Sequence, residues 1–188
     1  MDKKDDLNIK VAKRKVFGHR IKSSSFFEKS NHFNGDIDLS EISDVAKQLK
    51  SLNYDDKYLL YVISFRAILE DIVKKYLYDR NIPMVGNFKE NMIKMLVDMQ
   101  DILKVTKTST KKDEKKRILQ KFKGYDAFNN FIAGINIKFN SENYDKFLHS
   151  LTHNPSKVDK DFALEIANDL ILPLYVLSKL MKDENLFQ

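Results

Sequence analysis

The scarcity of residues that break regular structure is the feature that most restricts how this sequence can fold. Five glycines and three prolines are spread over 188 residues. A sheet-rich fold needs such residues at each of its many tight turns, whereas long uninterrupted segments favour helices. The length suits one domain with its own hydrophobic core. We therefore expect an all-α, single-domain helical bundle of five to seven helices.

Periodic apolar residues predict where the helices lie. The strongest pattern covers 55–80, where apolar side chains recur every three or four positions and Asn81-Ile82-Pro83 supplies a stop signal. A first helix is expected from Asp38, because Asp38 and Glu41 have the spacing of a capping box, with an apolar stripe that ends at Leu49. The other expected helices are 88–103, 114–122, 126–134, 141–153 and 159–181, the last of which contains Pro173.

The first 35 residues lack a sustained period of either kind, so we predict a basic, partly flexible N-terminal arm over 1–35 and a helical bundle domain over 36–188. The chain is charged from its second residue and lacks the apolar stretch of a secretory signal. Its apolar runs are shorter than the roughly 20 residues that span a bilayer. With no cysteine, disulfides are excluded and the reducing cytosol is the natural compartment. We expect a cytoplasmic protein with no membrane partner.

The net charge of +6 is unevenly distributed. Residues 1–22 hold eight Lys/Arg against three acids and residues 104–123 hold nine against two, so the rest of the chain sums to −6. This asymmetry indicates a polyanionic partner such as nucleic acid, or else a solvated lysine-rich face. The candidate nucleic-acid-binding residues are Lys111, Lys112, Lys115, Lys116 and Arg117, with Lys13, Arg14 and Lys15 of the arm. Tyr125 and Phe128 adjoin the cluster and either stack on unpaired bases or belong to the core.

A row of polar residues lies in the helix expected at 141–153. Asp145, His149 and His153 are spaced four residues apart, so they share one helix face. Two histidines at this spacing can hold a divalent metal. However, the sequence has no HExxH motif, and His153 followed by Asn154 and Pro155 is typical of a helix C-terminus. We expect no metal or other cofactor. His153 also has the chemistry of a general acid or base, which needs a nearby cation to act on a phosphate.

Arg66 is expected on the apolar side of the helix at 55–80. A partly buried arginine must be paired, because an uncompensated charge in a core is costly. Glu70 lies one turn further on. An Arg66 to Glu70 tie that fixes helix packing is one interpretation, and pairing across the bundle to the region of His153 is the other.

Two segments together resemble the HEPN superfamily of small helical domains. The first is 65–77, with the Arg-x-x-Leu-Glu pattern from Arg66 to Glu70, and the second is 147–154, which ends in His153-Asn154. The resemblance covers roughly 55–181. It implies a helical bundle that often dimerises through the face bearing the histidine and, in active members, metal-independent RNA cleavage. On this basis the candidate catalytic residues are His153, Asn154 and Arg66.

Active members of that superfamily carry an arginine separated from the histidine by four to six residues. The corresponding positions here are Lys146, Phe147 and Leu148, so the arginine is missing. Our leading hypothesis is therefore a non-catalytic HEPN-like module, as a homodimer, that binds nucleic acid, RNA rather than DNA, or a partner protein in a prokaryotic defence, toxin–antitoxin or regulatory system.

Two alternatives stay open. One is a metal-independent endoribonuclease that uses His153, with Lys146, Arg66 or a residue of a dimer mate in place of the arginine. The other is a purely protein-binding subunit or inhibitor. The sequence has no Walker A loop, dinucleotide-binding fingerprint, nucleophile elbow or cysteine nucleophile, which sets aside most familiar enzyme classes.

Overall fold

The fold is all-helical throughout the part of the chain that the structure, a computed structural model, describes: residues 26–36, 38–50, 54–106 and 109–187. Lys13, Arg14 and Lys15 lie outside these residues. The elements are α1 (Asp44–Lys50), α2 (Tyr54–Asp79), α3 (Phe88–Leu103), α4 (Lys112–Lys121), α5 (Tyr125–Ser141), α6 (Tyr144–His153), the 3-10 turn η1 (Pro155–Lys157), α7 (Lys160–Ile166), the π-helical turn η2 (Ala167–Ile171) and α8 (Leu172–Asp183).

Because α7, η2 and α8 join without a break, the described residues form seven helices, which confirms the expected single-domain bundle. None of these helices combines the length and hydrophobicity needed to cross a membrane.

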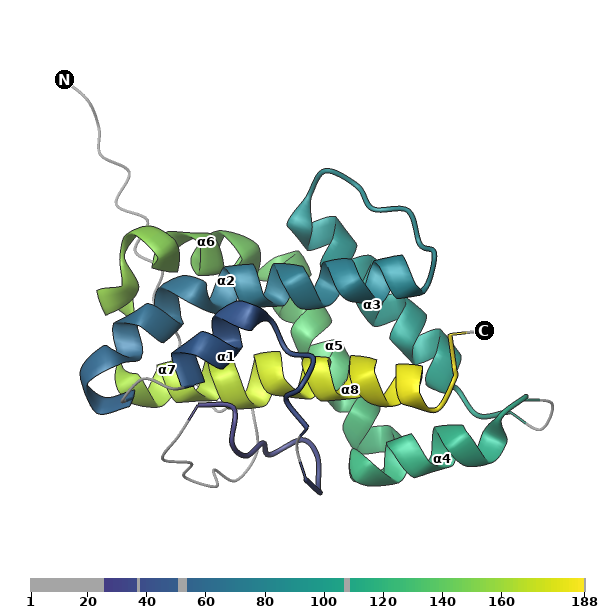
Figure 1. Ribbon diagram of the computed structural model, residues 1–188. Coiled ribbons are helices and arrows are strands. Elements are labelled where there is room, and N and C mark those ends of the chain that lie inside the picture. Colours follow the sequence, from purple (N-terminus) through teal and green to yellow (C-terminus); the bar gives the residue numbers. More distant parts are fainter. Residues whose placement is uncertain (1–25, 37, 51–53, 107–108, 188) are drawn as a thin grey trace.

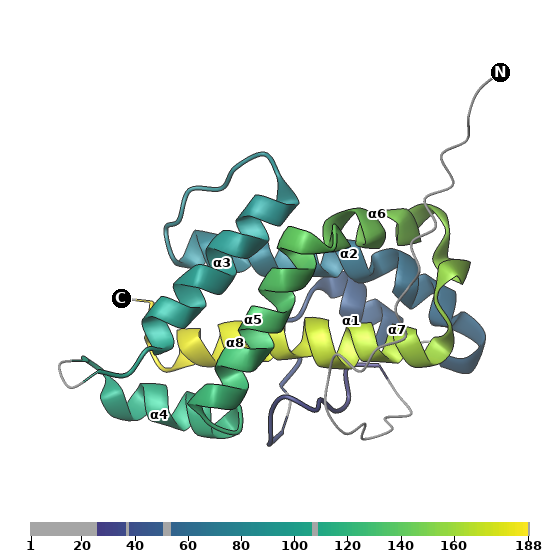
Figure 2. The same ribbon diagram turned by 180° about the vertical axis from the view of Figure 1, so that it is seen from behind.

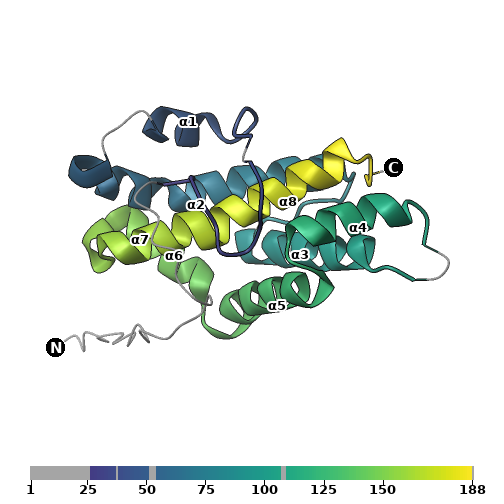
Figure 3. The same ribbon diagram turned by 90° about the horizontal axis from the view of Figure 1, so that it is seen from below.

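Two long helices run through the centre of the bundle. In Figure 1, α2 and the continuous α7–η2–α8 helix lie side by side and run in the same direction. Figure 2 shows α6 lying along α2, and α3 beside α5. Figure 3 shows α1 on one side of this central pair, with α4 and α5 on the other side. The helix α2 contacts α1, α3, α6 and the long helix, so its residues face several neighbours at once.

The apolar periodicity predicted the core well in α2 and α3. The bounds of α3 match the expected 88–103, and the five residues that the apolar period places on its inner face are all buried, namely Met92, Met95, Leu96, Met99 and Leu103. In α2 the period predicts an apolar ridge of Leu59, Val62, Phe65, Leu69, Ile72 and Tyr76. This ridge is buried except for Leu59, which is exposed. The side chain of Asn87 accepts a hydrogen bond from the backbone N–H of Glu90 (3.3 Å), which caps the start of α3.

The first helix was expected to begin at Asp38 but begins at Asp44. The Asp38 carboxylate accepts hydrogen bonds from the backbone N–H (2.8 Å) and the hydroxyl (3.0 Å) of Ser40, and so closes a local turn. Ile42 is buried beside this turn, whereas Val45 of the predicted apolar stripe is exposed.

Other helix bounds differ from expectation by one to seven residues. The helix α4 begins two residues early, and α6 begins at Tyr144 rather than at 141. The helix α5 continues to Ser141, seven residues beyond the expected end at 134, because Ile135 and Phe139 extend its buried face. Burial of such side chains outweighs the cost of about 1 kcal/mol for Gly134 inside a helix.

The segment 26–36 has irregular backbone, but it packs against the helices instead of forming an arm. Phe26, Phe27 and Phe33 are all buried in the core. The ring of Phe26 stacks on the ring of Tyr61 with centroids 4.0 Å apart. These three rings therefore contribute to the core of the helical bundle.

The π-helical turn η2 allows the last helix to pass Pro173. Proline has no backbone N–H, so it cannot bond to the carbonyl four residues back, at Asp169. The residue before the proline, Leu172, donates its backbone N–H to the carbonyl of Ala167, five residues back, which is the spacing of a π-helix. The helix therefore continues through the expected position of a break.

Two buried polar side chains of this turn hold the segment 26–36. The side-chain oxygen of Asn168 accepts a hydrogen bond from the backbone N–H of Phe27 (2.6 Å). The Asp169 carboxylate accepts bonds from the backbone N–H (2.7 Å) and the side-chain amide (2.9 Å) of Asn31, and from the hydroxyl of Ser30 (3.2 Å). A buried carboxylate needs such partners, because desolvating it alone is costly.

Candidate functional site

Arg66 joins three helices. Its Nε donates to Glu70 Oε1 (2.8 Å), as the structural interpretation of the sequence expects. Its Nη1 donates to the backbone carbonyl of Asp145 (3.0 Å), at the start of α6. The guanidinium carbon also lies 5.1 Å from the centre of the Phe88 ring, at the start of α3. Arg66 therefore holds the first turns of α3 and α6 against α2.

His153 lies at the opposite end of α6 from the contact with Arg66. Eight residues separate Asp145 from His153, which corresponds to about 12 Å along the helix axis. His153 is exposed, and its ring meets the ring of His149 edge-on with centroids 5.1 Å apart. The structure thus places Arg66 beside Asp145 and away from His153, so it does not bring the candidate catalytic residues together.

Along the chain, His153 is followed after four residues by an exposed cation, Lys157, at the end of η1. Asn154 is the C-terminal cap residue of α6, and its side-chain oxygen accepts a hydrogen bond from the hydroxyl of Ser156 (2.8 Å). Lys146 lies two turns back along the helix. In the described ranges no three His, Cys, Asp or Glu side chains converge as metal ligands, so the row that includes Asp145 does not form a metal site there.

The basic cluster of the sequence lies on and beside α4. Lys112, Lys116 and Arg117 are exposed and Lys115 is half-buried. Lys111 precedes the helix in a left-handed conformation, with a φ of 52°. The buried Ile118 and Leu119 fix the opposite side of α4 to the core. The amphipathic character of this helix turns its charged face to solvent.

Two cations of the cluster serve to attach α4 to the end of α8. Arg117 Nη2 lies 2.6 Å from Glu184 Oε2, and this partner holds the pKa of the Glu184 carboxyl below its usual value. Lys111 Nζ donates to the backbone carbonyl of Asn185. Lys116 makes only a long, exposed contact of 4.0 Å with Asp113. Lys112, Lys115 and Lys116 are therefore the cluster residues best able to contact a phosphate.

The two aromatic residues next to the cluster have different environments. Phe128 is fully buried (0% exposed), so it belongs to the core and cannot stack on a base. Tyr125 begins α5 and is 41% exposed. Lys123, in the preceding turn, donates to the backbone carbonyl of Asn31 (2.6 Å). Tyr125 is thus the one of these two rings that a bound strand can reach.

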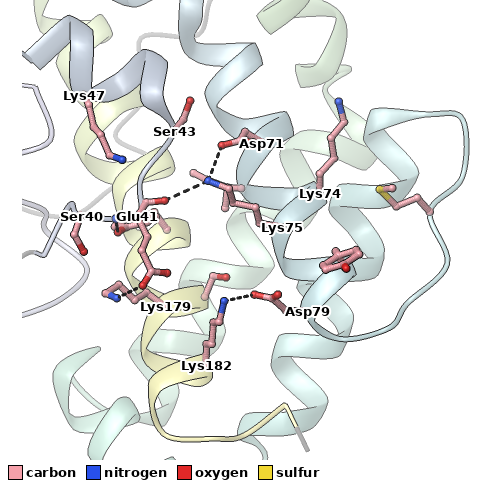
Figure 4. A pocket seen from close by; sticks show the side chains of 15 residues that line it. Ser40, Glu41, Ser43, Lys47, Asp71, Lys74, Lys75, Asp79, Lys179 and Lys182 are labelled. Carbon is pink, nitrogen blue, oxygen red and sulfur yellow. Dashed lines mark hydrogen bonds and ion pairs between the residues drawn. The ribbon is translucent and has the colours of Figure 1, made fainter.

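A hollow of about 630 Å³ lies between the turn before α1, the second half of α2 and α8, and no sequence pattern predicted it (Figure 4). Its lining includes five lysines, namely Lys47, Lys74, Lys75, Lys179 and Lys182. They come from three segments far apart in the chain, and each segment alone looks like an ordinary solvated helix face. The one local hint was a tyrosine, Tyr78, that follows two lysines of α2 and is exposed.

A comparison of the chain with models of protein families, with curated proteins and with solved structures finds no match. The resemblance to the HEPN superfamily therefore stays a prediction that depends on the residues quoted for it. The function of the protein must be inferred from the charge and shape of its own surfaces.

Proposed function

We propose that this protein is a non-catalytic HEPN-like module that binds nucleic acid, RNA rather than DNA, through the exposed face of α4. The observation that supports the proposal is the surplus of cations there. Residues 111–123 hold seven Lys/Arg against two acids. Glu184 neutralises Arg117, which leaves a local charge of about +4. The preference for RNA and a homodimeric state follow from the HEPN resemblance alone.

This surface is suited to contact phosphates without reading bases. Lysine side chains on an exposed helix neutralise phosphates and release counterions, which makes binding weaken with salt. For single strands the logarithm of the affinity falls with the logarithm of the salt concentration by about 0.7 per phosphate neutralised. Three lysines on α4 therefore account for a slope of about 2.

The test replaces Lys112, Lys115 and Lys116 by glutamine together. We expect the triple variant to bind a labelled 20-nucleotide RNA more weakly, with a salt slope smaller by about 2, in fluorescence anisotropy between 50 and 200 mM salt. The matched control replaces the exposed Lys29, Lys57 and Lys157, which removes the same charge elsewhere. An equal loss of affinity in both variants would mean that only net charge matters and would contradict a site on α4.

Absence of cleavage is the second part of the proposal. The guanidinium of Arg66 is engaged by Glu70 and by the backbone carbonyl of Asp145, at the end of α6 away from His153. We expect the purified protein to leave RNA intact in the presence of a chelator. Cleavage by the unsubstituted protein that is lost in His153→Ala would instead support the endoribonuclease hypothesis.

A further inference from the structure

The hollow between the turn at 38–43, α2 and α8 has the size of a small-molecule site. Its volume of about 630 Å³ falls within the range of roughly 300–1,000 Å³ that is usual for ligand pockets. It contains none of the α4 residues, so an inference about it does not depend on the proposed function.

Lysines from separate helices face this hollow (Figure 4). Lys75 Nζ lies 3.2 Å from Asp71, and Lys182 Nζ lies 2.9 Å from Asp79. Lys179 Nζ lies 3.1 Å from Glu41. Five lysines and three carboxylates line the hollow. Four more carboxylates beside it also pair with these lysines, namely Asp38, Asp44, Glu70 and Asp183.

The ion pairs at the mouth of the hollow are easily exchanged for pairs with a ligand. The side chains of Lys74, Lys75 and Lys182 are each more than half exposed. Solvent-exposed ion pairs contribute little to stability, because water and salt screen them. A phosphate can therefore replace a carboxylate as the partner of Lys75 or Lys182 without destabilising the fold.

An exposed aromatic ring lies on the same side of α2 as these lysines. Tyr78 is 79% exposed, which is the largest exposed fraction among the large hydrophobic residues of the described chain. It follows Lys74 by four residues and Lys75 by three, so the three side chains are neighbours on the helix surface. Met84, which is 54% exposed, adds an apolar group to the same lining.

We propose that this hollow binds a nucleotide, with an unpaired base stacked on Tyr78 and its phosphate between Lys75 and Lys182. A flat ring exposed to solvent beside cations is the arrangement that recognises a base together with its phosphate. An acidic peptide would satisfy the lysines but would leave the aromatic ring without a flat partner. A free nucleotide and the end of a single strand present the same chemistry to the hollow.

The sequence contains no tryptophan, so Tyr78→Trp places one fluorescent reporter in the hollow. We expect ATP, or an RNA pentamer with a 5′-phosphate, to quench this reporter in a saturable way, because a stacked base quenches an indole. Saturation by ATP alone indicates a free nucleotide, and saturation by the pentamer alone indicates a strand end. Adding Lys75→Gln and Lys182→Gln should raise the half-saturating concentration about tenfold or more.

An Ile137→Trp variant is the matched control, since Ile137 is exposed and lies outside both the hollow and α4. ATP should leave the fluorescence of this control variant unchanged. Calorimetry on the unsubstituted protein and on Tyr78→Ala checks the result without a reporter, and the alanine variant should bind about tenfold more weakly.

Absence of saturable quenching and of heat with both probes would overturn the proposal. Two other results would also overturn the proposal. One is a glutamate octamer that binds as tightly as ATP or the RNA pentamer, and the other is a half-saturating concentration that does not change when Lys75 and Lys182 are replaced. Loss of RNA binding in the α4 triple variant is a separate measurement, so failure of one site is distinguishable from failure of the other.

Discussion

Stability should depend on pH through one buried imidazole. His32 lies in the segment 26–36, and its ring lies 4.5 Å from the ring of Phe131, centroid to centroid. Burial lowers the pKa of His32 to about 4, since the interior disfavours the charged form. The charge of Asp169 opposes this shift and that of Lys123 adds to it.

The sign and size of the effect depend on the two pKa values. His32 has a pKa of about 4 in the folded protein and an ordinary value of 6.5 when unfolded. Its neutral form is favoured by folding, so the stabilisation is complete above pH 6.5 and is lost as the pH falls toward 4. At pH 5 the loss is about 2 kcal/mol, and its limit below pH 4 is about 3 kcal/mol.

Urea unfolding at pH 7.5 and pH 5.0 measures this loss. We compare the unsubstituted protein with His32→Phe, which keeps an aromatic ring against Phe131 but cannot ionise. Between these pH values the unsubstituted protein should lose about 2 kcal/mol more unfolding free energy than the variant. The carboxylates that also titrate are common to both proteins and cancel in the difference.

The control is His153→Gln, which removes an exposed imidazole outside the segment 26–36. Equal pH dependence in the unsubstituted protein and in His32→Phe would refute the reasoning. An NMR titration in which the His32 ring protonates near pH 6.5 would refute it independently.

Four further substitutions test the packing. Asp98→Ala removes the carboxylate that accepts hydrogen bonds from the Tyr76 hydroxyl (2.6 Å) and the Arg80 guanidinium (2.8 and 3.1 Å). The Arg80 side chain is only 20% exposed and would lose its ion-pair partner. The substitution should therefore lower the free energy of unfolding by about 3 kcal/mol in chemical denaturation. Tyr76→Phe, which removes one hydrogen bond, should cost about 1 kcal/mol in the same assay. Phe128→Ala should cost about 3 to 5 kcal/mol, whereas Tyr125→Ala should stay within about 0.5 kcal/mol by thermal unfolding.

The sequence predicted the fold best where local signals agreed with one another. In α3 the apolar period predicted both bounds correctly, and the structure adds a cap by Asn87 that agrees with the predicted start. At Asp38 the same kind of signal was misleading. A carboxylate that bonds the N–H two residues on closes a turn as readily as it caps a helix, and only the packing of Ile42 decides between them.

The site was predictable only where its contacts are local. Glu70 follows Arg66 by one helical turn, so their pairing could be inferred from spacing. The bond from Arg66 to Asp145 crosses 79 residues, and the pair of Arg117 and Glu184 crosses 67. Nothing in the sequence marks such partners, because each depends on how two helices are placed by the core.

The hydrogen bonds at η2 also decide where the domain can be cut. A shortened chain that starts at residue 36 would take away the donors that Phe27, Ser30 and Asn31 supply. The Asn168 amide and the Asp169 carboxylate would then face a newly opened gap in the middle of the α7–η2–α8 helix, at a cost of several kcal/mol. The smallest piece that retains these bonds must therefore begin at or before Phe26, which makes the ten irregular residues 26–35 as necessary to the architecture as any turn of helix.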